Sequence, residues 1–237
     1  MTSPPWLSIV IPAHDERESL PALLAGLEEQ VGGWPEAAGA TEVVVVDDGS
    51  SDGTADVARS ACSALSVRVL RNEQRRGYGV AVYRGLVSAT AARVAYLDGD
   101  GQLDPGDLRY LTTVLEGGGY DLVAGARHAR VDPPHRRAIG FAYNASVRLA
   151  TGTQYLDVDC GLKVMRRSVL DRVRLVCEGN LFGAELMAKA TRAGLAVIEL
   201  PVRHRPRQAG RPKGADLFAV SHAAREIVTH WRELVSA

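Results

Sequence analysis

The chain has 237 residues, with 28 Lys and Arg against 28 Asp and Glu, and it contains three cysteines. Balanced charge gives no global field that favours nucleic acid or an anionic membrane, and three cysteines, an odd number without zinc spacing, fit a reducing compartment. The first residues lack a signal-peptide pattern, and no apolar run approaches the roughly 18 residues of a membrane span. We therefore expect a cytoplasmic α/β protein with one sizeable core.

Strands and helices alternate along the first half of the chain. Apolar runs rich in β-branched residues predict strands, and leucines at helical spacing between Leu20 and Leu27 predict a helix. The expected strands are 7–11 (ended by Pro12), 42–46, 67–70, 94–97 and 121–124, and the expected helices are 19–30, 54–64, 78–91 and 108–115. This order predicts a Rossmann-like, mostly parallel sheet flanked by helices.

Three polar clusters follow expected strands at their carboxyl ends. They occupy 12–16, 47–48 and 98–102. Ligands of open α/β sheets bind outside the carboxyl ends of the strands. The three clusters therefore predict one binding site at a single edge of the sheet.

The most informative cluster is Asp98-Gly-Asp100-Gly-Gln102, directly after an apolar strand. Residues two apart in extended backbone point to the same side, so Asp98 and Asp100 can bind one divalent cation, with Gln102 as a third oxygen ligand. Oxygen ligands favour Mg²⁺ or Mn²⁺, and glycines such as Gly99 allow a phosphate to approach the backbone. A plain Asp/Gly turn is the alternative. An EF-hand is excluded, because Leu103 stands where its loop needs glycine.

The other polar positions have weaker readings. Asp47 can accept hydrogen bonds from a base or ribose, although a turn acid is the alternative. The stretch from Asn72 to Gly79 leads into a helix, and its glycines suggest close approach of a ligand or a plain loop. Neither a dinucleotide-binding fingerprint nor a P-loop is present.

Three segments carry a resemblance to a known family. They are Ser8-Ile-Val-Ile-Pro-Ala-His-Asp-Glu16, Val43-Val-Val-Val-Asp-Asp-Gly-Ser-Ser-Asp-Gly-Thr54 and Asp98-Gly-Asp-Gly-Gln102. In this order they resemble inverting family 2 glycosyltransferases with the GT-A fold, over nearly the whole chain. The form Asp-x-Asp-x-Gln, followed by Asp104-Pro105, is similar to dolichol- or polyprenyl-phosphate mannose or glucose synthases.

Further segments agree with the resemblance. Segment 121–127 resembles a strand whose arginine faces the diphosphate, 157–166 resembles the acceptor side, and 199–213 resembles a mobile loop that closes on the nucleotide. Two departures, His14-Asp15-Glu16 for Tyr-Asn-Glu and Pro212-Lys213 for Ser-Lys, leave the base (GDP or UDP) and the sugar open.

The resemblance implies a single GT-A domain over 1–237. Its half 1–126 would bind the nucleotide sugar, and 127–237 would form the acceptor side, with a mobile loop at 203–214 and a C-terminal helix. The implied catalytic residues are Asp98, Asp100, Arg127 and Glu185, and the metal ligands are Asp98, Asp100 and Gln102. The implied nucleotide-sugar contacts are Pro12, Ala13, His14, Glu16, Asp47, Gly49, Asn72, Gly77, Asp98, Gly99, Asp100, Arg127, Arg207 and Lys213.

The acceptor is the open question. The resemblance implies transfer to a polyprenyl phosphate, which needs no protein base, whereas a hydroxyl acceptor would need one, with Glu185 or Asp157 as candidates. A soluble acceptor is the alternative, and a nucleotidyltransferase is a distant third. The stretch 216–234 has apolar residues at helical spacing and predicts either a packed helix or one lying peripherally on the inner face of the membrane.

Overall fold

The computed structural model describes residues 4–37, 40–61, 65–128 and 134–206, together with Arg225 and Thr229, apart from the side chains of 134–139, 143 and 150. Seven strands form one sheet in the order β3-β2-β1-β4-β6-β5-β7. Six run in one direction, and β6 is antiparallel to both of its neighbours. The strands are β1 (Leu7–Ala13), β2 (Thr41–Asp47), β3 (Ser66–Arg71), β4 (Arg93–Leu97), β5 (Leu122–His128), β6 (Leu162–Arg166) and β7 (Val197–Arg203). The expected mostly parallel α/β sheet is confirmed.

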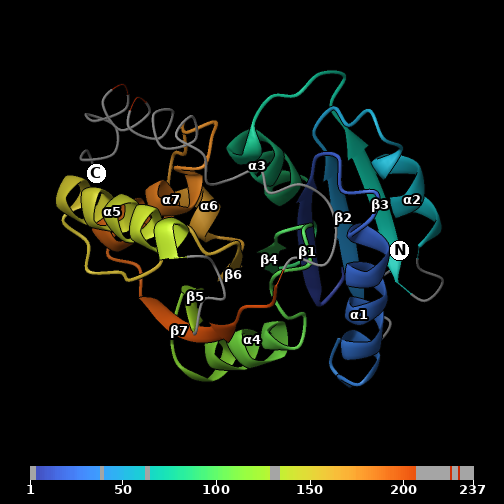
Figure 1. The fold of residues 1–237 in the computed structure, drawn as a ribbon. Helices are drawn as coiled ribbons and strands as arrows, with labels where there is room; N and C mark the ends of the chain where they lie inside the picture. Colours follow the sequence, from blue (N-terminus) through green and yellow to red (C-terminus); the bar gives the residue numbers. More distant parts are fainter. Residues whose placement is uncertain are drawn as a thin grey trace.

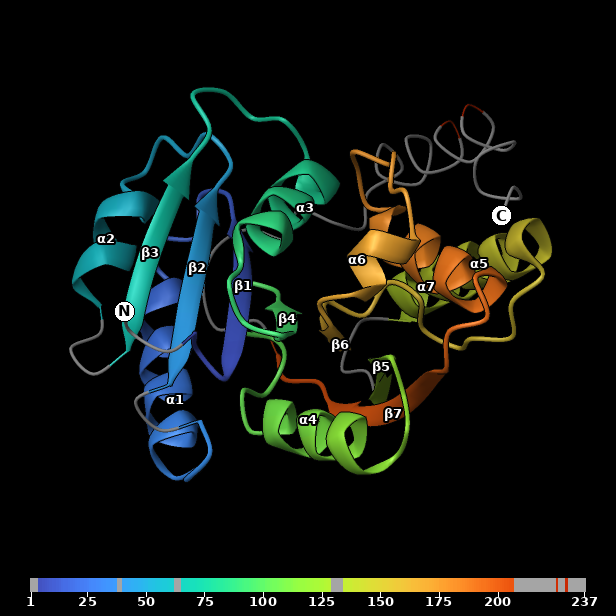
Figure 2. The same ribbon diagram turned by 180° about the vertical axis from the view of Figure 1, so that it is seen from behind.

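Helices cover both faces of the sheet (Figures 1 and 2). On one face α1 (Leu20–Gly32), α2 (Thr54–Ser60) and α4 (Asp107–Gly117) bury their apolar sides against residues such as Ile9, Val43 and Leu97. On the other face α3 (Tyr78–Ser88), α5 (Pro134–Thr151), α6 (Val169–Arg172) and α7 (Phe182–Arg192) pack on the alternate residues, among them Val10, Val44 and Tyr96. The strands buried on both faces are the β-branched runs of the sequence.

The first strand differs from its expected end, since β1 continues through Pro12 to Ala13. The carbonyl of Ala13 accepts a hydrogen bond from the amide of Asp48 on the β2 side at 2.8 Å. Successive residues of a strand face opposite neighbours, so the backbone of Pro12 faces β4, whose ladder with β1 ends at Val10. Its missing N–H therefore breaks no ladder bond, and proline is tolerated.

The second half of the fold departs from simple alternation. In the segment after β5, α5 is an 18-residue helix, and the chain re-enters the sheet as the antiparallel strand β6 between β4 and β5. Helices α5, α6 and α7 gather on the β6 side of the molecule in both views (Figures 1 and 2). Within the described ranges, no helix is both long enough and apolar enough to cross a membrane.

Candidate active site

The metal-binding cluster predicted from sequence lies where β4 ends. Asp98 follows Leu97 directly, and the amide of Asp98 donates to the carbonyl of Gly161 at 3.0 Å. Burial raises the pKa of Asp98 to about 7, and repulsion from Asp100 adds to the rise. Two carboxylates that repel one another at a strand end form a site that a cation would stabilise.

The third predicted ligand, Gln102, joins this loop to the segment after β7. Its amide N–H donates to Oδ1 of Asp100 at 3.0 Å, and its carbonyl accepts from the amide of Arg205 at 2.7 Å. Its side-chain nitrogen lies 3.5 Å from Nε2 of His204. Histidine is a common metal ligand in proteins, so His204 joins the candidate ligands, although no sequence motif marks it.

Tyr78, at the first position of α3, is a second residue that the sequence reading missed. Its hydroxyl donates to Oδ1 of Asp98 at 2.7 Å, and burial and the Asp98 charge hold the pKa of Tyr78 well above its usual range. Gly161 closes the other side, because a methyl group built there would overlap the Asp98 carboxylate. Asp98 is thus held between a phenol and a backbone that only glycine allows.

The predicted nucleoside side consists of two interlocked turns after β1 and β2. His14 Nδ1 lies 2.9 Å from the carbonyl oxygen of Asp48, and the amide of Glu16 donates to the Thr54 hydroxyl at 2.9 Å. Glu16 also accepts from Ser19, whose hydroxyl reaches the carbonyl of Gly99 at 3.0 Å. The turns therefore connect the first predicted cluster to the metal-binding loop.

Asp47 offers the clearest hydrogen-bond acceptor for a ligand on this side. Its side chain is buried, Oδ1 accepts from the amide of Ser50 at 2.9 Å, and buried Oδ2 has no hydrogen-bond partner. The Arg71 guanidinium lies 3.4 Å from Oδ2 as an ion pair. Because a buried acceptor without a hydrogen bond is costly, Oδ2 is well suited to an N–H group of a bound base.

The loop 72–77 is shaped mainly by Asp48. Its carboxylate accepts from the Asn72 amide at 2.7 Å, from the Arg76 backbone at 2.8 Å and from the Gly77 backbone at 2.9 Å. Asn72 also accepts from Arg84. The side chain of Asn72, expected to contact the nucleotide sugar, is thus engaged inside the protein.

The glycines expected at the donor face also serve packing. Gly49 has φ of +70°, and a Cβ there would lie 2.5 Å from the backbone nitrogen of Arg75. A Cβ at Gly77 would lie 2.5 Å from the carbonyl oxygen of Glu178, and one at Gly99 would lie 2.9 Å from that of Pro12. Each glycine lets two backbone segments meet, which is a sufficient reason for its presence.

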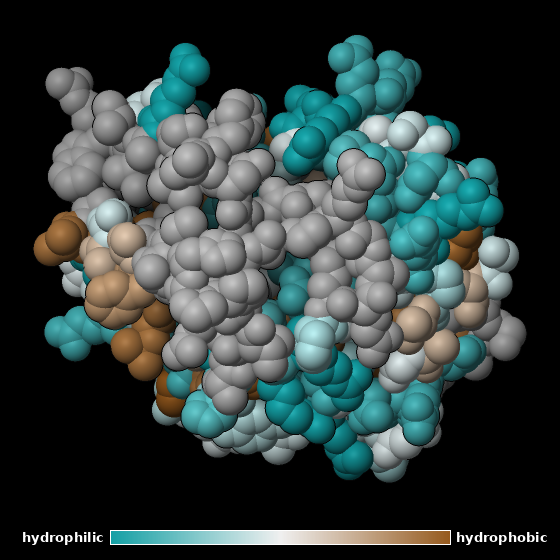
Figure 3. All heavy atoms as spheres, viewed as in Figure 1, coloured by the Kyte–Doolittle hydropathy of each residue, from teal (hydrophilic) through white to brown (hydrophobic). Residues whose placement is uncertain are grey.

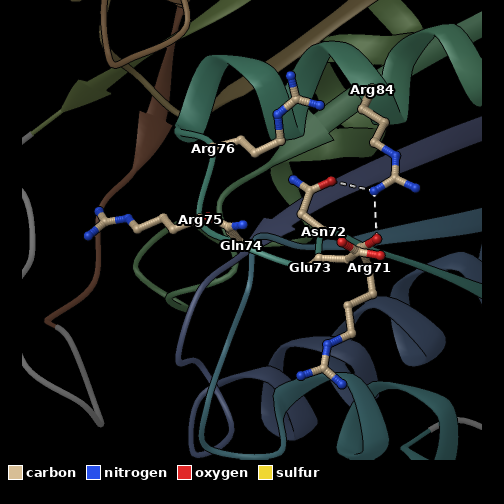
Figure 4. A pocket seen from close by; sticks show the side chains of 7 residues that line it. All are labelled: Arg71, Asn72, Glu73, Gln74, Arg75, Arg76 and Arg84. Carbon is tan, nitrogen blue, oxygen red and sulfur yellow. Dashed lines mark hydrogen bonds between the residues drawn. The ribbon is translucent and has the colours of Figure 1, made fainter.

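A hollow of about 600 Å³ lies beside this loop (Figure 4). Its lining residues are Arg71, Asn72, Glu73, Gln74, Arg75, Arg76 and Arg84. The guanidinium groups spread around the loop instead of meeting at one point. The hollow is therefore a basic rim of the expected donor side, without a preformed pocket for a single anion.

Arg127, expected to face the diphosphate, is bound to Asp157, which lies in the segment expected on the acceptor side. Its Nε and Nη2 donate to the two oxygens of Asp157, both at 2.7 Å, and its backbone amide donates to Oδ2 at 3.0 Å. Although burial opposes the charge, this pair holds the pKa of Arg127 well above its usual range. Arg127 lies near enough to Asp98 to lower the pKa of that acid. Arg127 contributes positive charge to the site, but two of its guanidinium nitrogens already donate to Asp157.

The expectation that Glu185 acts as a catalytic base is not met by its geometry. Its side chain is fully buried on α7 and accepts from the amides of Val176 and Cys177 and from Lys189 Nζ, at 2.8–3.0 Å. The backbone carbonyl of the next residue, Glu178, accepts from the amide of Gly79 near the start of α3 at 2.8 Å. Glu185 is therefore a structural acid that supports the end of α3 carrying Tyr78.

Several expected features fall outside the described residues. They are Arg207, Lys213, most of the loop 203–214 and the C-terminal helix 216–234.

The donor set fits a magnesium or manganese ion. Among the described residues no three His, Cys, Asp or Glu side chains form a cation cluster. The set here is instead two carboxylates, an amide and a nearby imidazole, which leaves coordination positions for phosphate oxygens. Mg²⁺ is commonly held in this way, by one or two carboxylates and its substrate's phosphates.

Comparisons with known proteins agree with the geometry. Residues 8–174 match the profile "Glycosyl transferase family 2". An "uncharacterized glycosyltransferase" of Mycobacterium tuberculosis is 35% identical over 210 residues, 87% of this chain and 88% of that protein. "Undecaprenyl-phosphate 4-deoxy-4-formamido-L-arabinose transferase" of Aeromonas hydrophila is 31% identical over 87% of this chain, which spans 62% of that protein.

Among solved structures, the fold resembles glucosyl-3-phosphoglycerate synthase of Mycobacterium tuberculosis, crystallised with Mn²⁺, UDP and glucosyl-3-phosphoglycerate. The TM-score is 0.71 at 22% identity, over 98% of this chain and 81% of that one. At this identity the likeness shows a shared fold.

Proposed function

The chain belongs to glycosyl transferase family 2, and from that premise we propose that it moves a sugar from a nucleoside-diphosphate sugar to a polyprenyl phosphate, with inversion and with Mg²⁺ or Mn²⁺. The observation that carries the proposal is the Asp98–Asp100 pair at the end of β4, near Arg127 and Asp159, which both influence the pKa of Asp98. The acceptor class is supported by the Aeromonas relative, whose name specifies undecaprenyl phosphate.

The nucleoside would lie against the turns after β1 and β2. The buried Oδ2 of Asp47 would accept an N–H of the base, and Pro12, Ala13, His14 and Glu16 would line the turn beside it. Both uracil and guanine carry a ring N–H, so either GDP or UDP satisfies this contact. Residues 1–126 thus remain our proposed donor half and 127–237 our proposed acceptor half.

Asp98, Asp100 and Gln102 would hold the cation, with His204 as a further candidate ligand. When bound, the ion would neutralise the negative charge that develops on the diphosphate leaving group. The protein prepares this site by fixing Asp98 through Tyr78 and Gly161. Arg207 and Lys213 are proposed to add positive charge on the diphosphate.

The acceptor needs no protein base if it is a phosphate, because its oxygen is already an anion. This matches the state of the two acids that a hydroxyl acceptor would require. Glu185 is buried in its bonds to α7 and the 176–177 loop, and Asp157 is bidentate with Arg127. Neither carboxylate is placed to take a proton from a substrate, so the geometry favours the phosphate.

The sugar remains the open part of the proposal. The resemblance suggested mannose or glucose, whereas the Aeromonas relative is named for a modified arabinose. The full-length chain should therefore be incubated with UDP- and GDP-linked sugars, Mn²⁺ and a lipid phosphate. We expect one donor to raise the melting temperature only with the metal and to give a product. If no donor binds in the presence of metal, the proposal fails.

A further inference from the structure

The outer side of α5 exposes large apolar side chains. Phe141 is 70% exposed and Leu149 is 85% exposed, and Leu156, just after the helix, is 69% exposed. The other large exposed hydrophobic residues in the described ranges, Tyr83, Val87 and Tyr110, are only 42–46% exposed. Scattered apolar residues are normal on a protein surface, but here the most exposed ones fall within 16 residues of each other in the sequence.

Helical geometry places the first two on one side of α5. At 3.6 residues per turn, Phe141 and Leu149 lie about 80° apart around the axis. Asn144, Val147 and Thr151, centred roughly 130° around the axis from the middle of that side, are buried. Apolar side chains gather on the side of the molecule where α5 lies (Figure 3, left).

Two alanines extend the apolar side of α5, and a neighbouring serine hydroxyl is hydrogen-bonded within the helix. Ala142 and Ala145 lie on the same side, and the Ser146 hydroxyl donates to the carbonyl of Ala142 at 2.9 Å. We name the surface formed by Phe141, Ala142, Ala145 and Leu149 the α5 face.

The charge of α5 fits one kind of partner. The ionisable side chains of its sequence, apart from Tyr143, are His135, Arg136, Arg137 and Arg148, and the helix contains no Asp or Glu. A helix with an apolar face and only cationic charges matches an anionic bilayer, where apolar groups enter the acyl boundary and cations meet the head groups. If α5 were neutral or acidic, it would lack this complementarity to anionic head groups.

The helix is also joined to the proposed site at both ends. The chain leaves β5 just after Arg127 and returns to the site at Asp157, which pairs with that arginine. On the buried side, the amide of Val158 donates to Oδ1 of Asn144 at 3.1 Å, which ties α5 to the active-site turn. A bilayer touching the α5 face would therefore lie next to the acceptor side.

We propose that the α5 face docks the enzyme onto an anionic lipid bilayer and so brings a membrane-embedded polyprenyl phosphate to the site. The inference rests on the proposed function for its acceptor, but the docking itself can be measured without donor, metal or acceptor.

The test is flotation of the full-length chain with vesicles of neutral phosphatidylcholine, or of the same lipid with about 30% anionic phosphatidylglycerol. Wild type is expected to float with anionic vesicles, less with neutral ones, and less again at high salt. The variant Phe141→Glu/Leu149→Glu is expected to lose vesicle binding by about tenfold or more, since each side chain stops contributing apolar burial. Tyr110→Glu, an exposed aromatic on α4, is the matched control and is expected to bind as wild type does.

A transfer assay with a short-chain, water-soluble polyprenyl phosphate separates docking from catalysis. The double variant is expected to keep wild-type transfer to this acceptor and to lose transfer to the long-chain lipid in vesicles. Absence of wild-type flotation, or equal flotation of wild type and the double variant, would overturn the proposal. So would a concentration-dependent dimer lost in that variant, because the α5 face would then bind a second copy. If docking holds but no transfer to any lipid phosphate occurs, the proposed function fails and the docking surface stands.

Discussion

The phenol of Tyr78 donates a hydrogen bond to Oδ1 of Asp98 at 2.7 Å, joining the first residue of α3 to the acid at the end of β4. The bond stabilises the charged form of Asp98 and so lowers its pKa, against burial and the repulsion of Asp100, which raise it to about 7. Metal binding requires the deprotonated carboxylate. Tyr78 therefore extends the proposed cation site to lower pH than burial and Asp100 alone would allow.

Removing that phenol is expected to shift the pH dependence of metal binding. As pH falls below about 7, a cation must displace the Asp98 proton and its apparent affinity drops. Tyr78→Phe deletes a stabilising bond to the carboxylate, so the pKa rises further and the midpoint for Mn²⁺ binding moves up by about one pH unit. Calorimetric titration of Mn²⁺ between pH 5.5 and about 8.5 measures this midpoint. Tyr83→Phe, an exposed tyrosine on the same helix, is the control, and equal midpoints in the two variants would refute the role.

The two carboxylate–metal contacts are expected to outweigh the amide contact. A carboxylate about 4 Å from a charge contributes on the order of 4 kcal/mol at an effective dielectric near 20, and a neutral amide contributes less. Asp100→Asn is therefore expected to reduce turnover more than Gln102→Ala, and excess chelator is expected to abolish it. Initial rates at saturating donor provide the comparison, with Asp56→Asn on α2 as a charge-matched control. Full turnover in excess chelator would show that the reaction does not need a metal ion.

Glycine at position 161 is expected to matter through Asp98. A methyl group there would overlap the Asp98 carboxylate, so Gly161→Ala should displace that side chain and weaken Mn²⁺ binding by about tenfold or more. Gly117→Ala, where a methyl meets no atom within 4 Å, is the matched control. Calorimetry and thermal melting together separate lost ligation from lost fold. Unchanged Mn²⁺ affinity in Gly161→Ala would show that the backbone around residue 161 moves and that the Asp98 side chain keeps its position.

Glu185 is expected to affect stability more than chemistry. Glu185→Gln weakens a buried set of bonds to Val176, Cys177 and Lys189, and should lower the free energy of unfolding by about 1–3 kcal/mol. The paired variant Glu185→Leu/Lys189→Met, which leaves no buried charge, should recover part of the stability that Glu185→Leu alone loses. Urea denaturation measures the loss, and the pH profile of kcat should stay that of wild type. A Gln variant of normal stability with no turnover would instead mark Glu185 as a base.

The first half of the fold was predictable because its signals are local. Buried parallel strands are β-branched runs, and the polar clusters at 12–16, 47–48 and 98–102 follow the strands directly. Pro12 was misread as a strand end because the tolerance for proline depends on where the neighbouring ladder stops, at Val10. That information lies in β4, far along the chain.

The partners of the site residues were not predictable from sequence. Whether Arg127 faces a phosphate or Asp157, and whether Glu185 faces substrate or Lys189, depends on contacts across tens of residues or on which helix face is buried. Tyr78 and His204 carry no motif of their own and reach Asp98 and Gln102 only through tertiary packing. Antiparallel β6 likewise follows from the return of the chain after α5, which no period in the sequence marks.

In the proposed reaction the accepting group is a lipid phosphate. The most direct measurement supplies the full-length chain with its donor, Mn²⁺ and either a short-chain polyprenyl phosphate or the matching free alcohol, and quantifies the glycosylated lipid. With Glu185 and Asp157 both engaged inside the protein, we expect transfer to the phosphate and none to the alcohol. Transfer to the alcohol at a comparable rate, or donor hydrolysis without transfer to either lipid, would contradict a lipid-phosphate acceptor.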